Sequence, residues 1–152
     1  MKYMNASRLS GVKKQRGFTL LEMIVVLVII GLLAGLVGPS LFRQADRAKV
    51  QTAETQIKMI RGALHAHRLD MGRFPSANEG LQGLVRAPSD AKQAQFWKGP
   101  YLDGDVPMDP WNRDYRYDLQ SSGNEGFSLY SYGADGEPGG EDFNTDIGYL
   151  PQ

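Results

Sequence analysis

The sequence has no cysteine and only two histidines among its 152 residues. Disulfides, cysteine-based zinc sites and cysteine–histidine catalytic pairs are therefore excluded. His65 and His67 stand two positions apart, so on a helix they point to different sides and form no joint metal site. A Gly-x-Ser-x-Gly motif and a P-loop are also missing. These absences leave a membrane-anchored enzyme only as a remote alternative.

Acidic residues are missing from the beginning of the chain. Between Met1 and Leu21 there is no Asp or Glu, and every charged side chain is basic, namely Lys2, Arg8, Lys13, Lys14 and Arg16. This bias predicts a cytoplasmic N-terminus and a C-terminal part across the membrane. The whole chain has 17 basic and 17 acidic residues, which excludes a strong electrostatic attraction to nucleic acid.

Charged residues are also missing from Met23 to Phe42. At about 1.5 Å per residue, roughly 20 helical residues cross a hydrocarbon core of about 30 Å. A cleaved secretory signal is the alternative, with Gly35, Gly38 and Ser40 as loose cleavage-site candidates. The apolar run is longer than the usual signal core of about 7–15 residues, and the helical pattern continues beyond it, which favours a membrane helix.

Glu22 is the one carboxylate at the edge of this run. An ionised acid in lipid costs on the order of 2.5–3.5 kcal/mol, so Glu22 needs a partner. Cleavage after Gly17 would free the amine of Phe18, one helical turn before Glu22. That amine could pair with Glu22 of its own chain or of a neighbour, and the second arrangement would set the register between subunits.

The stretch Arg16-Gly17-Phe18-Thr19-Leu20-Leu21-Glu22 resembles the leader and processing site of type IV pilins and pseudopilins. The resemblance implies that a membrane peptidase cuts after Gly17 and methylates the new N-terminal Phe18. It also implies that Glu22 is used in assembly. Residues 1–17 would then be a cleaved leader and residues 18–42 a transmembrane and assembly helix.

The helical pattern runs from Phe18 to about Arg68 and changes character after Phe42. There an apolar stripe steps by three and four, formed by Val50, Ala53, Ile57, Ile60 and Leu64. This predicts a helix over residues 43–70 that is covered by the remainder of the domain. Pro39 lacks a backbone donor, so we predict that the turns before it loosen when subunits pack.

The C-terminal part predicts short elements. Ser76 and Glu79 form a capping-box pattern for a short helix through Leu84, and residues 87–109 read as a long loop pinned by Phe96, Trp97 and Tyr101. Alternation around residues 121–124 predicts an antiparallel hairpin of 115–118 and 127–131, with a last strand near 147–150. The fold class is α+β, with a small antiparallel sheet packed on the long helix.

Three segments of this region, Phe74-Pro75-Ser76, Trp97-Lys98-Gly99-Pro100-Tyr101-Leu102 and Asp109-Pro110-Trp111, resemble the major pseudopilins of type II secretion, the general secretion pathway protein G family. The resemblance implies a pilin-like fold over residues 18–152 with a periplasmic domain at 43–152. One departure is Asn112-Arg113-Asp114, where the family usually has a Gly-Asn turn.

Residues 133–146 form a loop with five acids and four glycines. Its oxygen atoms suit a hard cation such as Ca²⁺, but the spacing is not that of an EF-hand. Composition alone favours a solvated acidic loop over a cation site. The resemblance implies a calcium site with the carbonyl of Tyr132 and the carboxylates of Asp135 and Asp142. Asp146 is a further candidate, and Glu141 could substitute for it.

The resemblance implies a non-enzymatic subunit that polymerises into the pseudopilus of a type II secretion system and drives export of folded proteins across the outer membrane. Its partners would be other copies of itself, minor pseudopilins, the assembly platform and the prepilin peptidase. It would sit in the bacterial inner membrane as a single-pass protein. A minor pseudopilin or a type IV pilin is the alternative, but type IV pilins commonly close a loop with a disulfide, which this chain cannot form.

Overall fold

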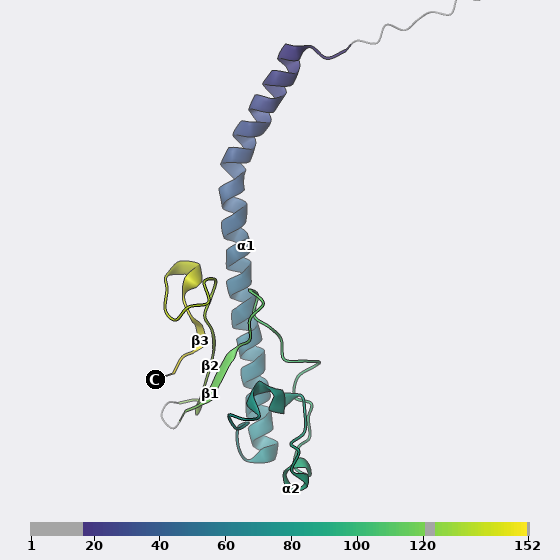
Figure 1. Ribbon diagram of the computed structural model, residues 1–152, viewed down its shortest axis with the longest axis vertical. Coiled ribbons are helices and arrows are strands. Elements are labelled where there is room, and N and C mark those ends of the chain that lie inside the picture. Colours follow the sequence, from purple (N-terminus) through teal and green to yellow (C-terminus); the bar gives the residue numbers. More distant parts are fainter. Residues whose placement is uncertain (1–16, 121–123, 152) are drawn as a thin grey trace, which may run out of the picture. The chain divides into compact units, whose positions relative to one another are not determined.

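The computed structural model of the chain describes residues 17–120 and 124–151. Helix α1 runs from Leu20 to Met71, and the 3-10 helix η1 (Gly80–Leu84), helix α2 (Ala91–Ala94), strands β1 (Arg116–Leu119) and β2 (Phe127–Ser131), the 3-10 helix η2 (Asp142–Asn144) and strand β3 (Ile147–Tyr149) follow (Figure 1). Internal contacts divide the chain between Ser40 and Leu41. The leader predicted at residues 1–17 lies outside the described residues, except for Gly17.

Helix α1 begins two residues later than predicted and ends at Met71, one residue beyond the predicted bound at residue 70. At its end, Gly72 donates its N–H to the carbonyl of Arg68 at 2.8 Å and has φ of +72°, the left-handed conformation of a glycine that closes a helix. Pro75 follows three residues on and cannot continue the helix. Gly72 and Pro75 therefore end the helix after Met71.

The three strands form an antiparallel sheet in the order β1-β2-β3, as the alternating pattern predicted. Leu119 pairs with Phe127 in the hairpin, and Ser131 pairs with Ile147 on the other side of β2. All five residues of the central strand are buried. The predicted turn at Ser121–Asn124 lies largely outside the described residues.

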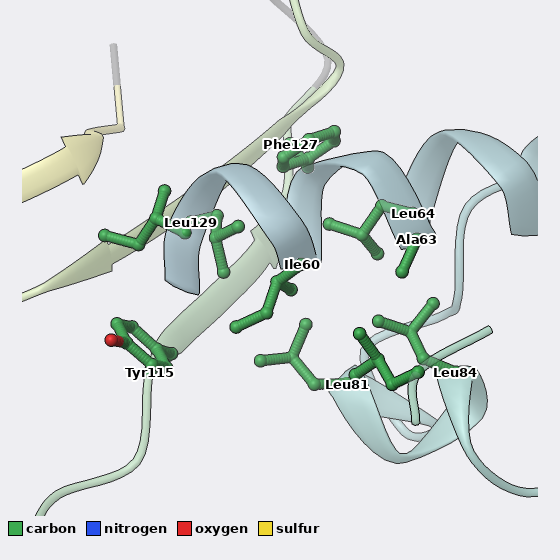
Figure 2. Packing of buried hydrophobic residues seen from close by; sticks show 10 residues of the cluster. Ile60, Ala63, Leu64, Leu81, Leu84, Tyr115, Phe127 and Leu129 are labelled. Atoms are coloured by element: carbon green, nitrogen blue, oxygen red, sulfur yellow. The ribbon is translucent and has the colours of Figure 1, made fainter. Parts of the chain in front are cut away.

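The core of the C-terminal unit lies where one face of α1 meets the sheet and η1 (Figure 2). Four of the five stripe residues are buried, and Val50 is half-buried. Figure 2 shows Ile60, Ala63 and Leu64 of α1 beside residues of η1, of β2 and of the segment just before β1, namely Leu81, Leu84, Phe127, Leu129 and Tyr115. The prediction that the sheet packs on the amphipathic part of the helix is confirmed.

The segment between α1 and β1 departs from prediction in two details. Ser76 N–H donates to Glu79 at 2.7 Å and Glu79 N–H donates back to the Ser76 hydroxyl at 3.4 Å, so the capping box is present. The helix behind it is a 3-10 helix. Trp97 anchors the long loop by donating its indole N–H to the Gly83 carbonyl at 3.1 Å, whereas Phe96 is 56% exposed and does not pin it.

Candidate functional site

The predicted processing motif lies at the start of α1. Gly17 and Phe18 precede the first helical residue and are exposed, and Phe18 is 79% exposed. Thr19 caps the helix, because its hydroxyl accepts the N–H of Glu22 at 3.2 Å and its carbonyl accepts the N–H of Met23 at 3.2 Å. The peptide bond between Gly17 and Phe18 therefore stands outside the helix, where an enzyme could reach it.

Glu22 lies in the first turn of α1 with its side chain exposed. The unpaired N–H groups of this turn favour a negative charge by about 0.3–1 kcal/mol at a water-exposed site. This contribution is smaller than the cost of placing an ionised acid in lipid, so a further positive partner is still required. Because Phe18 precedes the helix in the uncut chain, the two residues are not yet in the helical spacing that the sequence predicted.

The apolar side chains in the first part of α1 are exposed at its surface. The large apolar side chains described from Phe18 to Phe42 are all exposed, and this helix is the one described element long and apolar enough to cross a membrane. An added Cβ at Gly31, Gly35 or Gly38 would meet nothing within 4 Å in the single chain. Such a surface is stable only in lipid or against neighbouring helices.

Pro39 lies inside α1, which continues without interruption from Leu20 to Met71. One turn of this helix carries an extra bond, since the Ser40 hydroxyl donates to the Val37 carbonyl at 2.8 Å. The predicted loosening before Pro39 concerns packed subunits, so it stays a prediction.

The acidic loop follows β2 and is held by a few internal bonds. Ala134 N–H donates to the Phe143 carbonyl at 2.9 Å, and Gly139 N–H donates to Asp146 Oδ2 at 3.0 Å. Asp142 has φ of +52°, a left-handed conformation that is uncommon for a residue other than glycine. The two ends of the loop are thereby brought together.

The candidate ligands lie in different environments. Asp135 and Asp142 are exposed, as is Glu141, and within residues 17–120 and 124–151 no three carboxylate or imidazole groups are close enough to hold a metal ion. Asp146 differs, because its Oδ1 atom is buried and no described donor reaches it. A buried carboxylate oxygen without a donor fits a hard cation. The loop thus offers oxygen atoms of the kind that Ca²⁺ prefers, and Asp146 Oδ1 is buried without a donor, but the described carboxylates are not gathered into one cluster.

Three polar clusters were not predicted from the sequence. Arg73 donates to both carboxylate oxygens of Glu79, at 2.6 and 2.9 Å, and this contact lowers the pKa of Glu79 to about 2. Arg61 and His65 contact Glu125. The third cluster centres on Asp109, which is buried and accepts a 2.5 Å hydrogen bond from the Ser131 hydroxyl. Only the Ser76–Glu79 pattern gave a sequence signal for any of them.

The two histidines have separate structural roles. His67 is buried, its Nδ1 lies 3.0 Å from the Arg73 carbonyl, and burial lowers its pKa. His65 lies on another side of the helix beside Glu125. The prediction that they form no joint site is consistent with this arrangement.

A capped apolar helix with an acid in its first turn, followed by an amphipathic half that packs on an antiparallel hairpin, defines a pilin-like subunit with a membrane anchor. The family described as "Type II secretion system (T2SS), protein G" matches residues 40–150, and the prokaryotic N-terminal methylation motif matches residues 12–38. The chain belongs to the type II secretion system protein G family.

Several relatives support this membership, each called type II secretion system core protein G. The protein of Pseudomonas aeruginosa is 45% identical over 138 residues, which cover 90% of this chain and 95% of the relative. That of Vibrio cholerae is 40% identical over 137 residues, covering 90% and 92%. That of Escherichia coli K12 is 44% identical over 137 residues, covering 89% and 92%.

A solved structure also resembles the fold. The crystal structure of the major pseudopilin from the type 2 secretion system of enterohaemorrhagic Escherichia coli has a TM-score of 0.57 and 28% sequence identity, and the match covers 72% of this chain and 93% of that one. The family resemblance and the pilin-like fold predicted from the sequence are confirmed.

Proposed function

We propose that this chain is the major pseudopilin of a type II secretion system, which polymerises into the pseudopilus and drives export of folded proteins across the outer membrane. The observation that carries the proposal is the row of exposed large apolar side chains on α1 between Met23 and Phe42. Family membership tells which fibre this surface builds. The role is structural, and the chain performs no chemistry of its own.

Processing prepares the chain for assembly. The peptidase cuts after Gly17 and methylates the amine of Phe18, which the match to the methylation motif supports. The helix is anchored in the inner membrane with the C-terminal unit in the periplasm, as the basic residues before Gly17 favour. The partners are further copies of the chain, minor pseudopilins and the inner-membrane assembly platform.

Assembly depends on Glu22 and Pro39. The new amine of Phe18 neutralises Glu22 of a neighbouring subunit, so that a charge pair in lipid selects the register between copies. The turns before Pro39, which lack one backbone hydrogen bond, loosen as the helices pack. Unbroken helix through Pro39 in an assembled fibre would contradict the second step.

Calcium stabilises the C-terminal loop. Asp135, Asp142 and Asp146 supply carboxylate oxygens and Tyr132 supplies its carbonyl, with Glu141 as an alternative to Asp146. The buried Oδ1 atom of Asp146 supports this assignment. The ion ties the two arms of the loop in a chain that has no disulfide.

The experiment is a comparison of Glu22→Ala with Glu54→Ala, an exposed acid further along α1. Both are expressed with the secretion system, fibres are counted by electron microscopy, and the mature N-terminus is measured by mass spectrometry. We expect both variants to begin at methylated Phe18, and only Glu22→Ala to lose its fibres. A wild-type fibre yield from Glu22→Ala, or a mature chain that still begins at Met1, would overturn the proposal.

A further inference from the structure

Arg113 stands in the tight turn between Asp109 and β1. Asp109 N–H donates to the Arg113 carbonyl at 2.8 Å and Asn112 N–H donates to the Asp109 carbonyl at 2.9 Å, which closes the turn. Asn112 has φ of +65°, a left-handed conformation that asparagine adopts more readily than most residues with a side chain. These two hydrogen bonds close the turn, and Arg113 is the residue that follows Asn112.

The side chain of Asp109 needs a positive partner because only 1% of it is exposed. Its Oδ1 atom accepts the N–H groups of Trp111 at 3.0 Å and Arg113 at 2.9 Å, and its Oδ2 atom accepts the Ser131 hydroxyl. The guanidinium Nε of Arg113 lies 3.8 Å from Oδ2. Arg113 therefore lies beside a buried carboxylate at ion-pair distance, while its buried Nε has no hydrogen-bond partner among the described residues.

The other end of the guanidinium reaches the first arm of the acidic loop, which we define as residues 132–136. Arg113 Nη2 donates to the Gly133 carbonyl. An added Cβ at Gly136 would overlap Arg113 Nη1, so the guanidinium lies directly against the Gly136 backbone. Gly133 N–H also donates to the Ser131 hydroxyl at 3.3 Å, which links the same arm to Asp109.

We propose that Arg113 is a positioning residue for the calcium site: it holds the first arm of the loop in its bound shape before the ion arrives. The proposal rests on the calcium assignment made above. The first arm contains two of the proposed ligands, the carbonyl of Tyr132 and the carboxylate of Asp135. An arm that is already ordered does not have to be ordered by the ion, and this raises the affinity for the ion.

A lysine or a neutral side chain cannot do the same. Arginine presents a rigid planar fork, so one side faces Asp109 while the other donates to Gly133 and covers Gly136. Without the fork, residues 132–136 keep the bonds from Ala134 N–H to the Phe143 carbonyl and from Gly133 N–H to the Ser131 hydroxyl. The Asp135 side chain accepts only the Glu137 N–H at 3.1 Å, so the part of the arm after Ala134 has no other bond to the rest of the domain among the described residues. We therefore expect the arm to become mobile in the absence of calcium and to become ordered again when calcium binds.

The test compares Arg113→Gln with Arg86→Gln in the full chain in detergent. Arg86 is exposed, so its replacement removes the same charge from a distant surface site. Amide hydrogen exchange of residues 132–136 is measured with a chelator and with calcium, and calcium affinity is measured by titration calorimetry.

With the chelator, we expect Arg113→Gln to exchange the amides of the first arm at least about tenfold faster than the wild type, with much of the protection restored by calcium. We expect its calcium affinity to fall by roughly tenfold, and Arg86→Gln to match the wild type. The proposal would be overturned if the first arm exchanged equally fast in both variants. It would also be overturned if Arg113→Gln bound calcium with wild-type affinity but calcium did not slow the exchange of its first arm. If the wild type binds no calcium, the calcium assignment itself fails, and faster exchange in Arg113→Gln would then show that Arg113 orders the arm without serving an ion.

Discussion

Glu125 accepts two hydrogen bonds from the guanidinium of Arg61, 3.0 Å from Nε and 2.7 Å from Nη2. The contact joins the segment before β2 to α1, and His65, one helical turn from Arg61, lies 3.2 Å from the same carboxylate. A two-point contact between arginine and a carboxylate is stronger and more directional than an ordinary surface ion pair. The hairpin is therefore held on the helix at a polar point as well as through the apolar core.

Replacing Glu125 by Gln should lower the free energy of unfolding. The side chains of Arg61 and Glu125 are 40% and 23% exposed, so solvent weakens the pair, and we expect a loss of about 0.5–1.5 kcal/mol. Unfolding can be followed by the fluorescence of Trp97 and Trp111, since both lie in the C-terminal unit. Glu54→Gln, an exposed acid on the same helix, is the control and should stay within about 0.5 kcal/mol of the wild type. An equal loss in the two variants would show that the contact contributes nothing specific.

Gly148 in β3 should not tolerate a side chain. Its φ is +130°, and an added Cβ would overlap the carbonyl oxygen of Leu129 in the neighbouring strand. We expect Gly148→Ala to destabilise the C-terminal unit by roughly 1–3 kcal/mol. Gly62→Ala is the opposite case, because Gly62 is an exposed residue of α1 with open space around it. The free energy of unfolding of Gly62→Ala should rise by up to about 1 kcal/mol. Thermal melts of both variants are the measurement, and a loss of stability in Gly148→Ala alone would show that its backbone conformation and the close Leu129 carbonyl are the cause.

Glu79 should make the protein sensitive to acid. The hydrogen bonds from Arg73 hold the pKa of Glu79 at about 2 instead of its ordinary 4.5. A carboxyl whose pKa is lower in the folded state stabilises the fold at pH values above 4.5, and this contribution is lost as the pH falls toward 2. The loss in the free energy of unfolding is on the order of 1–3 kcal/mol, as the size of the pKa shift indicates. Solvent screening reduces it somewhat, because the Glu79 side chain is 22% exposed.

Glu79→Gln removes this carboxyl, so its melting temperature should lie below that of the wild type at pH 7. The two curves should converge between pH 4.5 and pH 2, since protonated Glu79 resembles glutamine. Other acids titrate in the same range, but they do so in both proteins and cancel in the difference. Two curves that remain parallel down to pH 2 would mean that Glu79 titrates at its ordinary pKa.

The sequence predicted the elements whose signals are local. The stripe from Val50 to Leu64 has the helical period, and the hairpin strands alternate on both sides of a turn, so the helix, the sheet and their contact were all found. The 3-10 form of η1 was missed because a capping box marks where a helix begins and not which kind of helix follows. Phe96 was expected to pin the long loop, but an aromatic residue in a loop has no pattern that tells which side it faces.

The polar clusters could not be predicted because their members are far apart in the chain. Arg61 and Glu125 are separated by 64 positions, and Asp109 and Ser131 by 22. The buried state of Asp109 depends on the turn, on β2 and on Arg113 together. The proposed calcium ligands had a compositional signal and a family resemblance, and neither distinguished Asp146, whose Oδ1 atom is buried, from its exposed neighbours.

Calcium removal gives the last prediction, and Asp146 decides it. The buried Oδ1 atom of Asp146 has no described donor, and a bound cation would supply the missing partner under the calcium proposal. We expect the melting temperature of the C-terminal unit, followed by tryptophan fluorescence, to fall when calcium is replaced by a chelator. The stabilisation by a ligand grows with its concentration above Kd, and about 100 times Kd contributes about 2.7 kcal/mol.

Asp146→Asn should remove this response to calcium, because an amide lacks the charge that a hard cation requires. In chelator, its melting temperature should equal or exceed that of the wild type, because the asparagine side chain is neutral. Glu137→Gln is the matched control, since Glu137 is an exposed acid of the same loop and should leave the calcium response intact. An unchanged melting temperature on chelation of the wild type would remove calcium from the function. If the calcium response survives in Asp146→Asn and disappears in Glu137→Gln, the ion binds at the exposed side of the loop and not at the buried Asp146 oxygen.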